Sequence, residues 1–215
     1  MTQTIQMRRP GAEASVRGLL RTLGFWAQVA FVLAYVGILS TAMFVFQFGL
    51  GEFPCPLCIT QRMGMIVATL GAVFILVQAL RGTLDMRGYT TGLGMSLLGA
   101  ILGAAMSVRQ VLLHIEPGDL GYGTAVFGKH LYTWALVTFI VVAVFVGALL
   151  LGSDAFFPIA PRSAALRVIV WILVWAFVAT IAVNLVVVFV ELGFNWFLPD
   201  NPTRYELLYQ IGIRR

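Results

Sequence analysis

Five long apolar segments constrain the fold of this chain more than any other feature of its sequence. Each is bounded by charged residues, Gly or Pro, and together they cover residues 25–50, 63–80, 90–108, 131–151 and 168–190. A helix needs about 20 apolar residues to cross a hydrocarbon core of about 30 Å, and the second segment is near the lower limit. All five are apolar on every face, whereas a barrel strand alternates apolar and polar residues. We therefore predict an all-α integral membrane protein with five transmembrane helices.

The composition of the chain excludes a water-soluble globule. Of the 215 residues, 60% are hydrophobic and 11% are charged, whereas a typical soluble domain has about 25% charged residues. Five spans leave no room for a large soluble domain, so the lipid bilayer is the expected surrounding. We expect no nucleic-acid partner, because the net charge of +5 is spread thinly along the chain.

Positive charges predict the orientation of the helices, because cytoplasmic loops carry an excess of Lys and Arg. Eight arginines precede the first segment or follow the second and fourth: Arg8, Arg9, Arg17, Arg21, Arg81, Arg87, Arg162 and Arg167. The opposite side has six basic residues, some of them at helix ends: Arg62, Arg109, Lys129, Arg204, Arg214 and Arg215. We therefore expect a cytoplasmic N-terminus and, after five spans, a C-terminus outside.

Basic residues before an apolar run, as at this N-terminus, are also typical of a signal peptide. The apolar run that follows it is about twice as long as the apolar region of a signal peptide, and no clear cleavage site closes the run. We therefore expect residues 1–24 to be a basic cytoplasmic tail and the first apolar segment to remain as a transmembrane helix.

Thiol, amide and ionisable side chains gather at the outer membrane boundary in this topology. They are Cys55, Cys58, Arg62, Arg109, Gln110, His114, Lys129, His130 and Glu191. Any one of them alone can be an interfacial anchor. Their position on the same side as both cysteines of the chain favours a functional site there.

The strongest local motif is a Cys-x-x-Cys sequence within PCPLCITQR at residues 54–62. Two such thiols can alternate between a dithiol and a disulfide. If a helix begins near Leu57, Cys58 lies in its first turn, where the helix dipole favours a thiolate. Arg62 follows four residues later and projects from the same helical face. Its guanidinium can stabilise a thiolate or hydrogen-bond the carbonyl oxygen of an electron acceptor.

Two other interpretations of the cysteine pair remain open at this point. The pair can form a structural disulfide, which is chemically permitted outside the inner membrane of a bacterium. It can also be half of a metal site. Zinc prefers four ligands, so His114 and His130 would have to complete such a site.

Two sequence segments resemble one known family. PCPLCITQR resembles the signature of DsbB-type disulfide bond formation proteins, and SVRQVLLH at residues 107–114 resembles the segment that closes the third helix of that family. The resemblance covers about residues 20–150. It implies a DsbB-type bundle of four transmembrane helices at residues 25–151, to which residues 152–215 add a fifth transmembrane helix and an outer tail.

The resemblance also implies a function. It indicates an enzyme of the bacterial inner membrane that oxidises extracytoplasmic thiols and passes two electrons to a membrane quinone, either ubiquinone or menaquinone. Cys55 and Cys58 would be the catalytic pair, Arg62 would contact the quinone, and Arg109 and His114 would be further quinone-binding residues. A thioredoxin-like protein would supply the thiols.

This sequence departs from the family pattern in its outer loop. Family members usually carry a second cysteine pair between the third and fourth helices, whereas residues 115–129 contain no Cys. A soluble partner must then reach Cys55, which we expect to be the more exposed thiol because Pro54 and Pro56 restrict its backbone. The alternative is a non-catalytic membrane subunit with a structural Cys55–Cys58 disulfide, whose fifth helix binds partner subunits.

Three further features have structural interpretations. Gly99 and Gly103 give the third helix a face of small residues that suits close helix packing within the molecule. Asn184 lies in the middle of the fifth segment and is expected to hydrogen-bond a neighbouring helix. A short interfacial helix is expected after Pro202.

Overall fold

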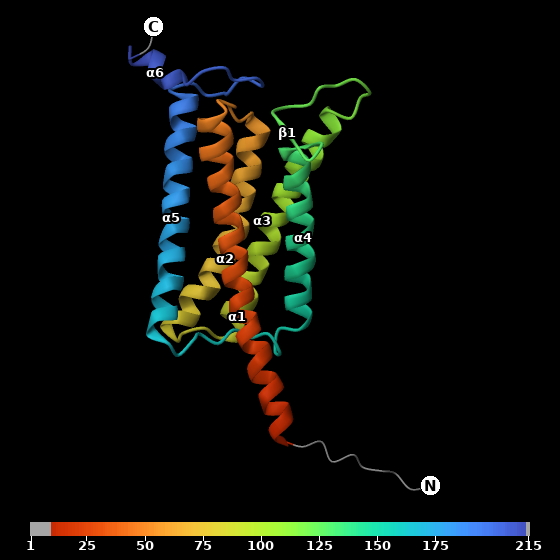
Figure 1. Ribbon diagram of the computed structural model, residues 1–215, viewed down its shortest axis with the longest axis vertical. Helices are drawn as coiled ribbons and strands as arrows, with labels where there is room; N and C mark the ends of the chain where they lie inside the picture. The colour runs from red at the N-terminus through yellow and green to blue at the C-terminus, as the bar shows by residue number, and fades with distance from the viewer. Residues whose placement is uncertain (1–9, 214–215) are drawn as a thin grey trace.

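The structure is a computed structural model that describes residues 10–213. Five long helices run roughly side by side (Figure 1). They are α1 (Pro10–Ser40) with its continuation η1 (Thr41–Gly49), α2 (Pro56–Arg81), α3 (Met86–Leu113), α4 (Leu131–Leu151) and α5 (Ala164–Leu192). Three short elements lie at one end: strands β1 (Ala125–Val126) and β2 (Lys129–His130), and helix α6 (Glu206–Gln210).

The five helices are long and apolar enough to cross a membrane. The prediction of an all-α integral membrane protein is therefore confirmed, with one small antiparallel hairpin, β1–β2, in the loop between α3 and α4. α4 has the predicted bounds, whereas α1, α2, α3 and α5 begin before the apolar segments that predicted them. The largest extension is in α1, which begins at Pro10, because polar residues continue the helix outside the span. The short helix expected after Pro202 is α6.

Helices α2 and α3 are the most closely packed pair. Side chains at Gly64 or Gly99 would collide with the backbone of the facing helix, at Gly103 and Ala68 respectively. At this close approach, Ser96 Oγ donates a hydrogen bond to the carbonyl oxygen of Ala68 at 2.8 Å. The expected packing role of Gly99 and Gly103 is confirmed, and the contact holds the middle parts of α2 and α3 together.

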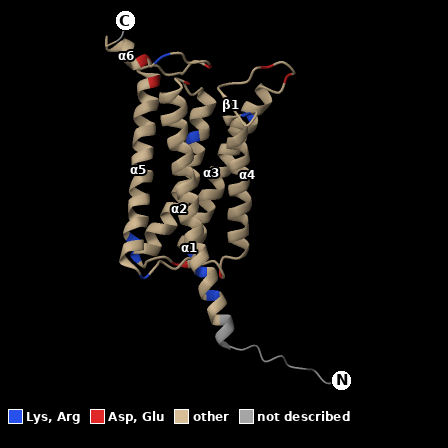
Figure 2. Ribbon diagram, in the orientation of Figure 1, with Lys and Arg blue, Asp and Glu red and all other residues tan. Residues whose placement is uncertain are grey.

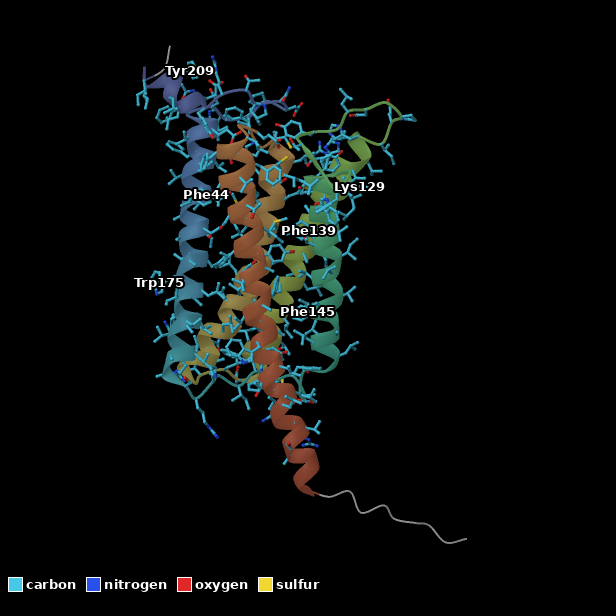
Figure 3. All side chains as sticks on the ribbon, viewed as in Figure 1. Phe44, Lys129, Phe139, Phe145, Trp175 and Tyr209 are labelled. Atoms are coloured by element: carbon cyan, nitrogen blue, oxygen red, sulfur yellow. The ribbon has the colours of Figure 1, made fainter. Side chains whose placement is uncertain are left out.

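The other helices surround this pair. α4 packs against α3, while α5 packs against α1 and α2, so α4 and α5 lie on opposite sides of the bundle (Figure 1). Apolar side chains cover the outward surfaces (Figure 3). Phe44 is 54% and Trp175 66% exposed, whereas Phe139 is fully buried. Such outward apolar surfaces suit contact with lipid.

The continuation of α1 is a π-helix, η1, in which backbone hydrogen bonds reach one residue further than in an α-helix. At its end, Leu50 N–H donates to the carbonyl oxygen of Val45 at 2.9 Å. Its buried side chains are Met43 and Gln47. Isolated π-turns occur frequently at functional sites. The sequence predicted only a transmembrane helix here, because the hydropathy of a segment does not report the width of its turns.

Charged residues lie mainly at the two ends of the bundle (Figure 2). The arginines that predicted the cytoplasmic side lie at the end of the bundle where the first helix begins: Arg17, Arg21, Arg81, Arg87, Arg162 and Arg167. Arg8, Arg9, Arg214 and Arg215, and residues 1–9 of the expected basic tail, are outside the described residues. We call the end that carries the N-terminal side of α2 the outer end.

The prediction for Asn184 is wrong. The residue is fully buried in α5, but neither atom of its amide group has a hydrogen-bond partner among the described residues. Gln28 of α1 is likewise buried without a partner in that part of the chain. A hydrogen bond between helices requires two polar groups at the same depth and facing each other, and the position of one residue in a span predicts neither.

Candidate functional site

Cys55 and Cys58 lie at the N-terminus of α2. Cys55 is the N-cap residue, with φ −68° and ψ 164°, and its Sγ accepts a hydrogen bond from Cys58 N–H at 3.2 Å. Pro56 occupies the first helical position, where the missing N–H has no partner to lose. Both cysteines are free thiols. The prolines and the cap therefore place both sulfurs at the positive end of the α2 dipole.

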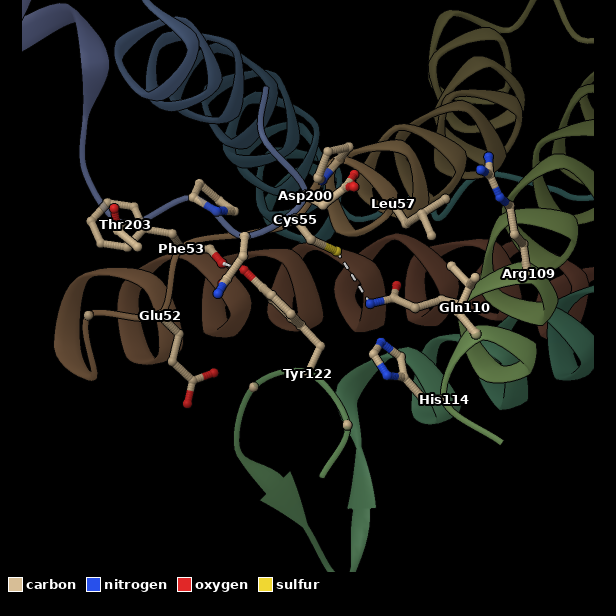
Figure 4. Close-up of a pocket in the computed structure, with 17 residues that line it drawn as sticks. Glu52, Phe53, Cys55, Leu57, Arg109, Gln110, His114, Tyr122, Asp200 and Thr203 are labelled. Carbon is tan, nitrogen blue, oxygen red and sulfur yellow. Dashed lines mark hydrogen bonds between the residues drawn. The ribbon is translucent and has the colours of Figure 1, made fainter. Parts of the chain in front are cut away.

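Gln110 of α3 joins the two sulfurs. Its Nε2 donates to Cys55 Sγ at 3.3 Å, shown in Figure 4, and lies 3.6 Å from Cys58 Sγ. The Oε1 atom of Gln110 accepts a hydrogen bond from Gln61 Nε2 at 2.7 Å. Both amide side chains are buried. Gln61 therefore fixes the Gln110 amide with its N–H groups directed toward sulfur.

These donors favour a thiolate at Cys55. The hydrogen bond from the Cys58 side chain, helped by the Cys58 and Leu57 backbone N–H groups and by Gln110, lowers the pKa of Cys55 despite its burial. A thiolate is the nucleophilic form of cysteine, and a thiol of low pKa is also the better leaving group. The arrangement therefore suits thiol–disulfide exchange.

Arg62 is buried one turn further along α2. Its Nη1 donates to Gln47 Oε1 at 2.8 Å, and its Nη2 donates to the carbonyl oxygen of Ala42 at 3.3 Å. Both partners are in η1. Gln47 Nε2 in turn donates to Glu191 Oε2 of α5 at 3.3 Å. A buried guanidinium is thus held between the first, second and fifth helices.

An open cavity of about 1040 Å³ lies at the outer end, and we call it the outer groove. It contains Cys55 and is bordered by the start of α2, the end of α3, the loop at residues 121–123 and the tail at residues 200–203 (Figure 4). Tyr122 in this lining donates from its hydroxyl to the carbonyl oxygen of Phe53 at 2.6 Å. Burial raises the pKa of Tyr122, so the hydroxyl remains a donor. The groove leads from the outer surface to Cys55.

A second, smaller cavity of about 90 Å³ contains Cys58 and Arg62, and we call it the inner cavity. Its lining comes from η1, the segment before α2, α2 itself, the loop after α3 and the start of α4: Ala42, Phe46, Glu52, Phe53, Pro54, Cys58, Gln61, Arg62, Tyr122, Gly123, Leu131 and Tyr132. Cys55 does not border this cavity and Cys58 does not border the outer groove. The two thiols therefore face different spaces although both contact Gln110.

The structure brings together three of the five residues expected in the site, Cys55, Cys58 and Arg62. Arg109 borders the outer groove, but its side chain is exposed and points away from the cysteines (Figure 4). His114 also borders the outer groove rather than the inner cavity. Arg109 and His114 are thus not placed beside Arg62.

His114 has its own set of contacts at the end of α3. Its Nδ1 lies 3.1 Å from Asp119 Oδ1, and its ring stacks on Tyr132 at 5.4 Å between centroids. The backbone N–H of Gly121, together with the His114 side chain, lowers the pKa of Asp119. These contacts hold the loop after α3 against the start of α4. Among the described residues, no group of three or more His, Cys, Asp or Glu is placed to hold a metal ion.

The expectation that Cys55 is the more exposed thiol is wrong. Cys55 is only 5% exposed, while Cys58 is partly exposed. The reason is tertiary: Gln110 lies against the Cys55 sulfur, and the tail at residues 200–203 borders the same groove. The adjacent prolines restrict the backbone of Cys55 but do not determine what packs over it.

Sequence reasoning placed Gln110 and Glu191 at the outer boundary but gave neither a role in the site, and it did not select Gln47. A signal for Gln110 was present, since it lies seven residues, or two helical turns, after Gly103 and therefore on the packing face of α3. Arg109, one residue earlier, is rotated by about 100° from that face. For Gln47 the sequence offers only its polarity within an apolar segment, and for Glu191 only its polarity at the end of one.

Comparisons with known proteins agree with this site. Residues 25–122 match the family described as Disulfide bond formation protein DsbB. A Disulfide bond formation protein B of Chromobacterium violaceum is 41% identical over 86 residues, which are 40% of this chain and 49% of the relative. Proteins of the same name from Xanthomonas axonopodis pv. citri and Xanthomonas campestris pv. campestris are each 38% identical. Their matches cover 88 and 98 residues, 41% and 45% of this chain, and 49% and 55% of the relatives.

These matches confirm the resemblance that the two motifs indicated, over residues 25–122 of the expected 20–150. The chain spans about half the length of the curated relatives it matches. The matched residues contain both cysteines, Arg62 and Gln110, whereas α4 and α5 lie beyond them. No solved structure matches the chain.

Proposed function

We propose, on the basis of the DsbB-type region at residues 25–122, that this chain is a membrane thiol–disulfide oxidoreductase. Electrons would pass from extracytoplasmic thiols through Cys55 and Cys58 to a membrane quinone. The observation that carries the proposal is the placement of the two sulfurs. They share the Gln110 amide, yet Cys55 faces the outer groove and Cys58 faces the inner cavity beside Arg62.

Exchange with the outer thiols takes place at Cys55. A partner thiolate attacks Cys55 Sγ of the oxidised pair, the S–S bond breaks, and its electron pair leaves on Cys58. A second partner thiol, once deprotonated, attacks the mixed disulfide, so that the partner leaves oxidised and Cys55 leaves as a thiolate. The low pKa of Cys55 favours that departure.

The residues that line the inner cavity have the chemistry that a quinone ring requires, and the cavity of about 90 Å³ would widen to admit the ring. Arg62 supplies a buried guanidinium that can donate to a carbonyl oxygen, and Phe46 and Leu131 supply apolar walls. A quinone bound there would accept two electrons and two protons. Arg62 holds its position through Gln47 and Ala42 and so presents its charge to the side of Cys58. As the S–S bond between Cys55 and Cys58 re-forms, the two sulfurs lose the two electrons that the quinone would accept.

The soluble partner would approach along the outer groove. Because the loop after α3 has no cysteine, the partner must react at Cys55 itself. The tail after α5 and the loop after α3 border the entrance to this residue. Asp200 and Thr203 lie on one side of the entrance and His114 on the other (Figure 4). We expect the partner to be a thioredoxin-like protein that presents an extended segment and its reactive cysteine to this groove.

The same proposal sets the location of the protein. The relatives are bacterial proteins, and the Arg-rich end of the bundle is the expected cytoplasmic face. The outer groove then opens outside the inner membrane, where disulfides persist. The outward face of α5 would contact lipid or a partner subunit.

Turnover of the purified protein tests the proposed function. In detergent with dithiothreitol, the unaltered protein should reduce a short-chain ubiquinone or menaquinone analogue, followed by the quinone absorbance. Comparison of the two analogues identifies the acceptor. Cys55→Ser and Cys58→Ser should each lower the rate to the background, whereas Arg87→Ala at the other end of the bundle should not change it. No turnover by the unaltered protein, with a disulfide that resists dithiothreitol, would instead support the non-catalytic subunit.

A further inference from the structure

Glu191 is a buried acid for which the proposed mechanism has no use. It lies near the outer end of α5, outside the region that matches the DsbB family, and its side chain is fully buried. Burial of a carboxylate is costly unless the charge is compensated. The groups that balance the charge of Glu191 therefore indicate what this residue does.

The charge of Glu191 is connected to Arg62 through one amide. Gln47 accepts from Arg62 at its carbonyl oxygen and donates to Glu191 at its amide nitrogen, at 2.8 and 3.3 Å. The amide dipole is thus aligned with a cation on one side and an anion on the other. Rotation of the amide by 180° would place its N–H groups against the Arg62 donors and its oxygen against the Glu191 oxygen, so both hydrogen bonds would be lost. The arrangement fits an ionised Glu191 opposite Arg62.

The second oxygen of Glu191 has no hydrogen-bond partner among the described residues. The negative charge is therefore balanced mainly by Arg62. The titratable groups whose charges interact with Glu191 are Arg62 and Cys58 of α2, Tyr122 of the loop after α3 and Tyr205 of the tail. Arg62 is also the cation beside Cys58 in the inner cavity. Any change in the charge of Glu191 alters how much positive charge Cys58 experiences.

We propose that Glu191 is a positioning residue that sets the reduction potential of the Cys55–Cys58 pair by balancing the charge of Arg62 through Gln47. This inference rests on the proposed redox function of the pair. The reduced pair carries negative charge as a thiolate and the disulfide carries none. An anion at Glu191 therefore disfavours the reduced form, while Arg62 favours it. In this way the fifth helix acts on the redox site without contact with the sulfurs.

The potential of the pair tests this proposal without quinone turnover. Quinone-free protein in detergent is equilibrated at pH 9, where a buried carboxyl group is ionised, with mixtures of reduced and oxidised dithiothreitol, and free thiols are counted by alkylation and mass spectrometry. Glu191→Gln keeps the shape and an acceptor for Gln47 but removes the charge. It should shift the equilibrium toward the reduced pair by about tenfold, equivalent to about 30 mV more oxidising.

Three further variants separate an electrostatic role from a structural one. Arg62→Gln should shift the equilibrium in the opposite direction, and the double variant, with neither charge, should lie between the two single variants. Glu191→Asp should stay close to the unaltered protein. Glu206→Gln, a partly exposed acid of α6 that is paired with Arg204, is the matched control and should have no effect. The double variant leaves no unpaired charge, so it tests the proposal even if Glu191→Gln alone folds poorly.

The proposal is overturned if Glu191→Gln leaves the equilibrium within about twofold of the control, or if both single variants shift it in the same direction. Failure of the proposed function gives a different result. In that case the unaltered protein would not reduce quinone, whatever the effect of Glu191 on the thiol equilibrium.

Discussion

Replacement of Gln110 by Met tests how the site holds a thiolate. The variant keeps the length and volume of the side chain but removes the N–H that donates to Cys55 and Cys58 at 3.3 and 3.6 Å. A hydrogen bond to a charged group contributes about 1.5–3 kcal/mol, and one pKa unit corresponds to about 1.36 kcal/mol. Gln110 is shared by two sulfurs and other donors to Cys55 remain. We therefore apply the lower end of that range and expect the pKa of Cys55 to rise by about one unit in the variant.

The sign of the effect follows from the direction of the native shift. The pKa of Cys55 is lowered to about 7, so the thiolate forms as the pH rises through 7 and is lost below it. In the variant that transition moves to about pH 8. Cys55 should react more slowly than in the unaltered protein near pH 7, and should not react more slowly above pH 9.

The measurement is the pH dependence of alkylation of the reduced protein, with the modified peptide identified by mass spectrometry. Because the two thiols titrate as a pair, the first apparent pKa is the quantity compared. Arg109→Met is the matched control, since its side chain points away from the sulfurs (Figure 4), and its profile should coincide with that of the unaltered protein. An unchanged profile for Gln110→Met, or an equal shift for Arg109→Met, would refute the role given to Gln110.

Three other predictions follow from the geometry. Arg62→Lys should raise the apparent KM for quinone and Arg62→Ala should raise it more, because Lys offers a charge without the planar fork of donors; equal KM values in steady-state assays would remove Arg62 from the site. Cys58→Ser should trap a mixed disulfide between Cys55 and an extracytoplasmic thioredoxin-like protein, whereas Cys55→Ser should trap little; equal adducts in non-reduced membranes would contradict this order. Gly99→Leu should lower the thermal unfolding temperature in detergent strongly, because α2 backbone occupies the space, whereas Gly94→Ala meets no atom within 4 Å and should not.

The sequence alone determined the class of the protein and the core of its site. Transmembrane helices can be recognised from sequence because each must be about 20 apolar residues long and must satisfy its own backbone hydrogen bonds in the bilayer. The sequence also predicted Cys55, Cys58 and Arg62 as site residues, since they lie within one short segment. Their relative placement depends on the cap and on the first turns of a single helix, which local sequence specifies.

Only the tertiary structure decided which residues complete the site. Gln110 rather than Arg109 faces the sulfurs because close packing against α2 fixes the rotation of α3. Cys55 is buried because Gln110, 55 positions further along the chain, lies against its sulfur, and the tail after α5 returns to border the same groove. Glu191 is connected to Arg62 through Gln47 because α5, η1 and α2 pack together at the same depth. Hydropathy and motif spacing describe one segment at a time, whereas these contacts depend on the rotation and depth of helices relative to one another.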